Sequence, residues 1–149
     1  MTKSNKILVT ISLLFIFVAP LAAAPEGITT GQQLQKKAEQ QTDSITTAEL
    51  MKMIDEELEM VLIDIRTTDE VRNMGGTIEA PQNHVIPRGW LEFRAPGVAL
   101  SKDTPIVVYC GAGIRSPLAA KSLQDMGYTN VKHYPPGFIG WRKEGLAVR

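Results

Sequence analysis

Two short runs rich in apolar residues stand out from a chain that otherwise mixes polar and apolar positions. They are Val61–Arg66 (VLIDIR) and Pro105–Cys110 (PIVVYC). Short runs dominated by Val and Ile are typical of strands that are buried on both faces, as in parallel sheets. Val131–Tyr134 predicts a third strand, and His84–Ile86 predicts a shorter one.

The segment before the first run repeats its apolar residues at helical spacing. Leu50, Met53 and Leu58 fall on one face of a helix of about three turns. Ahead of them, Thr46 and Glu49 have the spacing of a capping box, in which a hydroxyl is followed three residues later by a glutamate. The sequence therefore predicts a helix that begins at this pair.

Further helices are predicted after the strands. The longest is Ser116–Met126, with Ser116 as its N-cap, a proline at its first helical position and Gly127 as its C-cap. Shorter helices are predicted at Thr67–Asn73, which a pair of glycines ends, and at Phe138–Lys143.

The order of these elements predicts the fold class. Strands that alternate with helices imply a parallel sheet covered on both faces. We expect one domain at residues 45–149, a three-layer α/β/α fold with a central, mainly parallel sheet. Residues 25–44 are rich in Gln, Thr and Gly and carry no apolar stripe, so we expect a polar linker or a weak helix that does not pack. A helix that binds a partner is the alternative for this segment.

The first 24 residues have the layout of a secretory signal peptide. Lys3 and Lys6 precede the uncharged apolar run Ile7–Ala19, and small residues follow as far as Ala24. The run is short for a membrane span, which needs roughly 20 apolar residues. We expect cleavage near Ala24 and a periplasmic or secreted domain, with an uncleaved membrane anchor as the alternative.

Charge and cysteine content exclude several classes of function. Lys and Arg total 16, as do Asp and Glu, so the formal net charge is zero and nothing favours binding to nucleic acid. One cysteine allows no internal disulfide and is too few for a cysteine zinc site. His84 and His133 are expected to be surface or loop residues rather than metal ligands. We expect no metal and no cofactor.

The single cysteine, Cys110, ends one of the apolar runs. Parallel α/β folds bind ligands at the carboxyl ends of their strands. The glycine-rich residues 111–115 can turn their N–H groups toward the sulfur, the helix beginning at Ser116 adds the positive end of its dipole, and Arg115 adds a full charge. All three favour the thiolate, which is the nucleophilic form. The alternative is a buried, inert cysteine that packs as a small apolar residue.

Residues 110–116 (CGAGIRS) resemble the active-site loop of single-domain rhodanese-type sulfurtransferases. The resemblance extends to Val61–Arg66, with Glu70 beyond it, and to the aromatic segment Gly137–Trp141. It covers about residues 45–149 and implies a rhodanese-like fold.

The resemblance also implies a function, the transfer of sulfane sulfur. Cys110 would take the outer sulfur of a small donor, thiosulfate or a persulfide, and carry it as a persulfide until cyanide or a small or protein thiol removes it. Neither a metal nor a cofactor is implied. The loop that holds the persulfide would consist of Gly111, Ala112, Gly113, Ile114, Arg115 and Ser116.

Asp64 and Arg66, at the end of a predicted strand, are expected to support the site rather than to react. A buried Asp usually satisfies backbone N–H groups or pairs with an Arg. Arg66 and Glu70 are four residues apart, which favours an ion pair at the start of a helix. Trp90 and Trp141 are expected to be packing residues rather than binding platforms.

Loop length and the rim of the site separate the competing hypotheses. Cys110 to Arg115 spans six residues, the length that the resemblance associates with sulfurtransferases, whereas the phosphatase and arsenate-reductase relatives have a longer loop. Thr77 replaces a histidine frequent in the family, and Pro135–Gly137 replaces a usual glycine pair. Both changes are expected near the mouth of the site, where they favour a dedicated protein partner. The alternative function is a non-enzymatic binding or thiol-sensing module, and arsenate or phosphate-ester chemistry is less favoured.

Overall fold

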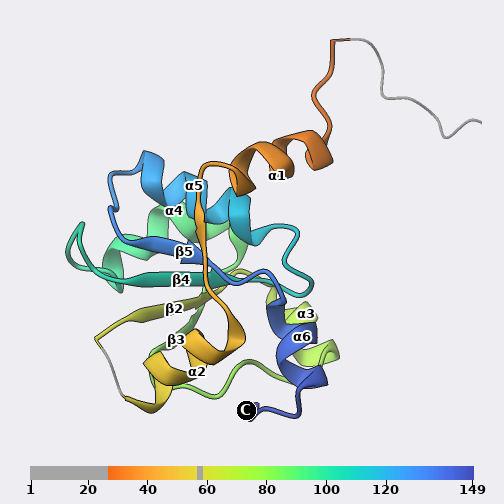
Figure 1. Ribbon diagram of the computed structural model, residues 1–149, viewed down its shortest axis with the longest axis vertical. Helices are drawn as coiled ribbons and strands as arrows, with labels where there is room; N and C mark the ends of the chain where they lie inside the picture. The colour runs from red at the N-terminus through yellow and green to blue at the C-terminus, as the bar shows by residue number, and fades with distance from the viewer. Residues whose placement is uncertain (1–26, 57–58) are drawn as a thin grey trace, which may run out of the picture.

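Both apolar runs form adjacent central strands of a parallel sheet (Figure 1). The computed structural model describes residues 27–56 and 59–149, and the signal peptide predicted for residues 1–24 lies outside them. Strand β2 (Val61–Asp64) pairs with β4 (Ile106–Tyr109) along its whole length, and every residue of both strands is buried. Burial on both faces explains why these runs carry so few polar residues.

The described residues form a sheet with the strand order β1-β5-β4-β2-β3. The outer strands are β1 (Asp43–Ser44), β3 (Asn83–Val85) and β5 (Val131–His133). Every pairing is parallel, which confirms the predicted sheet. Because all strands run in one direction, their carboxyl ends meet at one edge.

Helices cover both faces of the sheet and confirm the three-layer prediction. One face packs against α4 (Leu91–Arg94) and α5 (Ser116–Asp125), and the other packs against α2 (Thr47–Asp55) and α6 (Gly137–Lys143). The remaining short elements are α3 (Thr68–Asn73), beside α6, and the 3-10 turns η1 (Arg88–Trp90) and η2 (Ala95–Gly97), which flank α4. Among the described helices, none has the length and apolar character needed to cross a membrane.

Capping boxes are present at the start of helices α2 and α3. Thr46 and Glu49 form the predicted box at α2, and Thr67 and Glu70 form another at α3. In each box the hydroxyl accepts from a backbone N–H and the carboxylate accepts from the N-cap N–H. Such caps typically contribute about 1 kcal/mol each to helix stability.

Helix α5 begins one residue earlier than predicted. Ser116 is its first helical residue, and Arg115 is the N-cap. The Ser116 hydroxyl donates to the carbonyl oxygen of Gly113 at 3.1 Å. The prediction that Ser116 caps the helix is therefore wrong, because its hydroxyl closes the preceding loop instead.

The segment predicted to be a polar linker is part of the fold. Helix α1 (Gly31–Glu39) packs against α5, and residues 43–44 extend the sheet beside β5 (Figure 1). The one buried residue of α1 is Ala38, which is 3% exposed. The prediction of a segment that does not pack is wrong for residues 31–44, because the small alanine allows close approach and β1 pairs through its backbone. Neither contact needs an apolar stripe.

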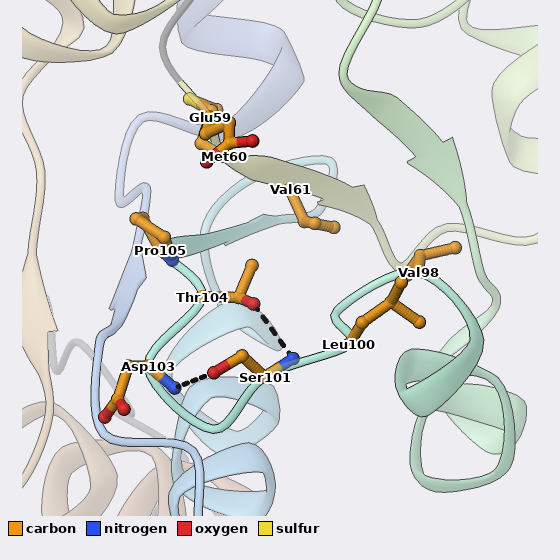
Figure 2. Close-up of a pocket in the computed structure, with 9 residues that line it drawn as sticks. All are labelled: Glu59, Met60, Val61, Val98, Leu100, Ser101, Asp103, Thr104 and Pro105. Atoms are coloured by element: carbon orange, nitrogen blue, oxygen red, sulfur yellow. Dashed lines mark hydrogen bonds between the residues drawn. The ribbon is translucent and has the colours of Figure 1, made fainter.

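A hollow of about 460 Å³ lies at the edge where the strands begin (Figure 2). Met60 and Val61 line it at the start of β2, and Val98, Leu100 and Pro105 line it from the segment that leads into β4. This edge is opposite the carboxyl ends of the strands, so the hollow is separate from the site described next.

Candidate active site

Cys110 directly follows β4 at the carboxyl edge of the sheet. Since β4 lies between β5 and β2, the cysteine is near the middle of that edge. The residue is 1% exposed and its thiol is free. This is the position predicted from the sequence, at the edge where parallel α/β folds bind ligands.

The loop after the cysteine keeps its backbone N–H groups uncommitted. No N–H of residues 111–116 donates to an acceptor in the described part of the chain. The carbonyls on either side are used, because Cys110 accepts from the N–H of Phe138 at 2.8 Å and Gly111 accepts from the N–H of Ile139 at 2.9 Å. Free N–H groups at the start of a ten-residue helix form a nest suited to an anion.

The close approach of two loops requires glycine at two positions. Gly113 has a φ of +75°, and a Cβ there would lie 1.9 Å from the carbonyl oxygen of Pro135. Gly137 has a φ of +59°, and its Cβ would lie 2.7 Å from the carbonyl oxygen of Gly111. The segment between β5 and α6 therefore packs backbone to backbone against the cysteine loop, near the site as the sequence predicted.

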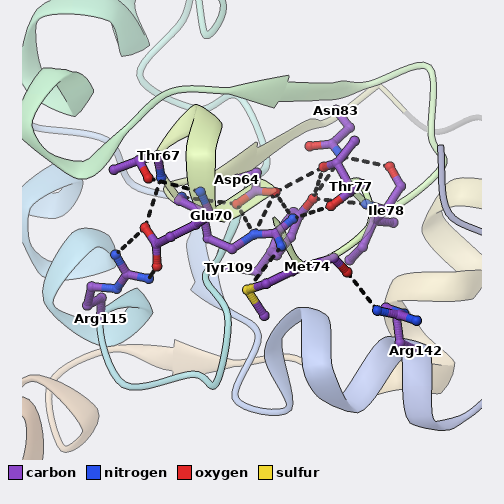
Figure 3. A network of polar contacts seen from close by, with 12 residues as sticks. Asp64, Thr67, Glu70, Met74, Thr77, Ile78, Asn83, Tyr109, Arg115 and Arg142 are labelled. Atoms are coloured by element: carbon purple, nitrogen blue, oxygen red, sulfur yellow. Dashed lines mark hydrogen bonds and ion pairs between the residues drawn. The ribbon is translucent and has the colours of Figure 1, made fainter. Parts of the chain in front are cut away.

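Arg115 is paired with a carboxylate from helix α3 (Figure 3). Its two terminal nitrogens donate to the Glu70 carboxylate at 2.5 and 3.0 Å. These hydrogen bonds raise the pKa of Arg115. The guanidinium in turn lowers the pKa of Glu70 to about 2. The Arg66–Glu70 ion pair predicted from the sequence does not form.

Replacing Glu70 with glutamine is expected to remove part of the pH dependence of stability. The folded pKa of Glu70 is depressed, so its contribution is fully present above the ordinary value of 4.5 and is lost as the pH falls toward about 2. Glu70→Gln should therefore melt at a lower temperature than the wild type at neutral pH, and the difference should narrow across this range. Melting temperatures measured by circular dichroism from about pH 6 to pH 2 check this. A difference that stays constant over that range would contradict it.

Arg66 is enclosed with Asp64 at the carboxyl end of β2, and both side chains have zero exposure. Arg66 donates from Nε to Oδ1 of Asp64 at 2.9 Å and from Nη2 to Oδ2 at 2.5 Å. The same carboxylate accepts the backbone N–H of Arg66 at 3.0 Å. The guanidinium also lies 3.9 Å from the ring centre of Phe138. The buried Asp64 carboxylate therefore pairs with an arginine and accepts a backbone N–H, which are the contacts expected of a buried aspartate.

Three further buried side chains are joined to this pair by hydrogen bonds (Figure 3). The Thr77 hydroxyl donates to Asp64 at 3.0 Å and shares a hydrogen bond of 2.5 Å with the Tyr109 hydroxyl, which also accepts from Asn83 at 2.8 Å. Thr77 is 7% exposed, so the expectation that it lies at the mouth of the site is wrong. Burial, together with the Asp64 charge, raises the pKa of Tyr109.

Sequence reasoning missed this network, although one signal was available. Tyr109 lies in a strand predicted to be buried, and a buried tyrosine needs a partner for its hydroxyl. Thr77 supplies it from the segment between α3 and β3, and Asn83 supplies it from the first position of β3. Both residues are far from Tyr109 in the sequence, so their hydrogen bonds to its hydroxyl could not be predicted from sequence spacing.

The two tryptophans have different roles. Trp141 is 4% exposed and donates from Nε1 to the carbonyl oxygen of Ala147 at 2.9 Å, so it packs as predicted. Trp90 is 53% exposed and meets Phe93 edge to face at 6.1 Å between ring centres. The packing prediction is wrong for Trp90, because α4 is a single turn that buries Leu91 and leaves these aromatic rings outside.

Both histidines lie in strands. His84 is in the outer strand β3 and is partly exposed, whereas His133 is in β5 and is 4% exposed. The prediction of a surface or loop residue is wrong for His133. Burial lowers its pKa and so favours the neutral ring.

A second hollow, of about 430 Å³, borders the cysteine loop. A Cβ at Gly111 would lie 3.4 Å from Cε of Met74, which places one wall of the hollow against that loop. The lining residues are Met74, Phe138, Ile139, Arg142 and Lys143. This hollow lies beside the residue that follows Cys110 and is large enough for a small molecule.

The motifs described above fall within a known protein family. The model of the rhodanese-like domain matches residues 46–144, which include β2, the cysteine loop and α6. The chain belongs to the rhodanese-like domain family. The match begins after α1 and β1, so these two elements lie outside the residues that define this rhodanese-like domain.

Two relatives show how far the similarity extends. A sulfurtransferase from Allochromatium vinosum is 29% identical over 108 residues, which cover 71% of this chain and 94% of that protein. A tRNA sulfurtransferase from Shewanella piezotolerans is 33% identical over 103 residues, or 69% of this chain. The aligned part is 20% of that relative, so this chain spans about a fifth of its length.

Two solved structures share the fold. A protein from Rhodopseudomonas palustris, described as a possible tyrosine phosphatase, aligns with a TM-score of 0.73 and 31% identity, covering 85% of this chain and 100% of that one. The polysulfide-sulfur transferase from Wolinella succinogenes aligns with a TM-score of 0.68 and 28% identity. The alignment covers 77% of this chain and 83% of that one. These alignments confirm the rhodanese-like α/β fold.

Proposed function

We propose that the protein transfers sulfane sulfur from a donor such as thiosulfate to cyanide or a thiol, through a persulfide on Cys110. The observation that carries this proposal is the set of free backbone N–H groups at residues 111–116, beside a cysteine at the carboxyl edge of the sheet. Donors fixed in advance around a reacting atom stabilise negative charge that develops there. The names of the sulfurtransferase relatives support the same chemistry.

The reaction has two half-reactions with Cys110 as the nucleophile. Its thiolate attacks the outer sulfur of thiosulfate, the bond between the two sulfur atoms of the donor breaks, and sulfite leaves with the electron pair. Cys110 keeps the outer sulfur as a persulfide, whose charge the loop N–H groups hold. The acceptor then attacks that outer sulfur, the new sulfur–sulfur bond breaks, and the Cys110 thiolate is restored.

Arg115 supports this chemistry by holding the loop in shape. Both of its terminal nitrogens are engaged by Glu70. The ion pair joins the last residue before α5 to the first turn of α3. This ion pair to α3, together with the backbone hydrogen bonds that α6 donates to the carbonyl oxygens of Cys110 and Gly111, keeps the N–H groups around the sulfur position.

Loop length disfavours phosphatase and arsenate-reductase chemistry. Cys110 to Arg115 spans six residues, shorter than the loop of those relatives, which surrounds a tetrahedral oxyanion. Gly113 is pressed against Pro135, so the loop has no room to widen on that side. A non-enzymatic binding module is the second candidate, and the 1% exposure of Cys110 is the observation that favours it.

A steady-state assay with thiosulfate and cyanide tests the proposal. We expect thiocyanate to form with parallel lines in double-reciprocal plots, because a covalent intermediate separates the two half-reactions. Cys110→Ser should lower the rate by at least about 10³-fold, since loss of the nucleophile leaves only binding and polarisation. Its melting temperature should stay within a few degrees of the wild-type value, which separates loss of chemistry from loss of fold. Equal rates for the two proteins would contradict the proposal and favour the binding module.

A further inference from the structure

We propose that the hollow lined by Met74, Phe138, Ile139, Arg142 and Lys143 binds small acceptor thiols that carry carboxylate groups. This inference rests on the persulfide proposed for Cys110. The hollow is adjacent to the reacting residue, because Met74 lies against Gly111 and the N–H of Ile139 donates to the carbonyl oxygen of Gly111. Two of the lining residues, Met74 and Ile139, therefore contact the residue that follows Cys110.

The hollow holds the cations of the site that no carboxylate neutralises. Arg66 is paired with Asp64, and Arg115 with Glu70. Arg142 and Lys143, in contrast, form no ion pair with any carboxylate in the described residues, and both are exposed. Anionic ligands are therefore attracted to the side of the site formed by α6.

Arg142 is oriented rather than free to move away. Its Nη1 donates to the carbonyl oxygen of Met74 at 2.6 Å (Figure 3), and its guanidinium lies 6.0 Å from the ring centre of Phe138. This single hydrogen bond leaves most of its five N–H donors available to a carboxylate. Lys143 is the next residue along α6, and it adds a second positive charge to the lining of the hollow.

The remaining lining explains why the ligand is an organic thiol rather than an inorganic ion. Met74, Phe138 and Ile139 present apolar surface, and Ile139 is 52% exposed although it is apolar. A volume of about 430 Å³ is in the range of sites for small organic molecules. A ligand with a short carbon chain covers this surface while its carboxylates reach the two cations.

The transfer step is balanced without any further reactant. The acceptor thiolate attacks the outer sulfur of the Cys110 persulfide and forms a new sulfur–sulfur bond. The bond between that sulfur and Cys110 breaks, and its electron pair returns to Cys110 as the thiolate. The products are the acceptor persulfide and the original enzyme, with no net change in charge.

The test measures how fast two thiols discharge protein that has been loaded with sulfur. Mercaptosuccinate carries two carboxylates, and 1-thioglycerol is a neutral thiol of similar size. We expect Lys143→Gln and Arg142→Gln each to lower the rate constant for mercaptosuccinate by about threefold or more at low salt, with a smaller effect at high salt. The rate constant for 1-thioglycerol should be unchanged. The control is Lys37→Gln, on α1, which removes the same charge on the opposite face of the sheet and should change neither rate.

Two results would overturn the inference and leave the proposed function standing: equal effects of the substitutions on both thiols, or no effect on either. A binding readout keeps the test independent of sulfur loading. Titration with the unreactive S-methyl derivative of mercaptosuccinate should shift the backbone NMR signals of Ile139 and Lys143 in the wild type, and less in Lys143→Gln. Absent shifts would overturn the inference, whereas failure of the wild type to load sulfur would instead overturn the proposed function.

Discussion

Asp64→Ala is expected to lower the free energy of unfolding by about 3–5 kcal/mol, the usual cost of breaking a buried ion pair by removing one partner. Arg66 has no exposure, so its guanidinium would remain buried with the carbonyl oxygen of Gly76 as its remaining oxygen acceptor. The Thr77 hydroxyl would also lose the Asp64 carboxylate as its acceptor. Urea denaturation followed by circular dichroism measures the change.

A surface ion pair provides the control for this prediction. Asp69 pairs with Arg72 at 3.2 Å, but their side chains are 80% and 73% exposed. Asp69→Ala should therefore change the unfolding free energy by no more than about 1 kcal/mol. Combining Asp64→Leu with Arg66→Met should recover part of the loss, because no unpaired charge then stays buried. Similar destabilisation by Asp64→Ala and Asp69→Ala would show that the buried pair does not have the importance assigned to it.

Gly113→Ala is expected to slow persulfide formation by about 100-fold or more, because a displacement of about 1 Å at a reacting group can have an effect of this size. The new Cβ would lie 1.9 Å from the carbonyl oxygen of Pro135, and the φ of +75° is unfavourable for alanine. The loop must move, and its N–H groups move with it. Rapid mixing with thiosulfate, followed by mass spectrometry of the quenched protein, gives the rate.

Gly127→Ala separates local strain from displacement of the loop. Gly127 also has a positive φ, of +103°, but a Cβ there meets nothing within 4 Å. It follows α5 at the end away from the cysteine, so we expect a modest loss of stability and an unchanged rate of persulfide formation. If Gly113→Ala reacted as fast as Gly127→Ala, the close packing against Pro135 would not be what shapes the nest.

The elements that sequence reasoning predicted correctly are those specified by neighbouring residues. The runs at β2 and β4 carry the pattern of doubly buried strands, and Thr46 with Glu49 carries the pattern of a capping box. The position of Cys110 followed from these elements, because a parallel sheet has its ligand-binding edge where the strands end. Local pattern was therefore sufficient to place Cys110 at the carboxyl edge of the sheet.

The partners of charged side chains were harder to predict, because they depend on contacts between distant segments. Glu70 lies four residues after Arg66, which made a local ion pair plausible, yet Glu70 pairs with Arg115 across the site. Arg66 instead turns back to Asp64, since both are buried at the end of β2 and neither charge can stay unpaired there. Sequence spacing does not reveal this exchange of partners.

The N-terminal helix shows a different limit. Residues 31–39 lack an apolar stripe, which is the usual signal for a packed helix. Only Ala38 is buried, and the strand that follows is held through its backbone bonds to β5. A contact made by one small side chain and by main-chain groups leaves little trace in the pattern of apolar residues.

The persulfide on Cys110 is tested most directly by the intact mass of the protein before and after treatment with thiosulfate, beside the Cys110→Ser variant. The proposed chemistry predicts a gain of about 32 Da, one sulfur atom, that cyanide removes and that the variant lacks. No gain in the wild type, together with slow alkylation of the thiol at neutral pH, would contradict it. The loop would then not activate Cys110, and the rhodanese-like domain would be a binding module.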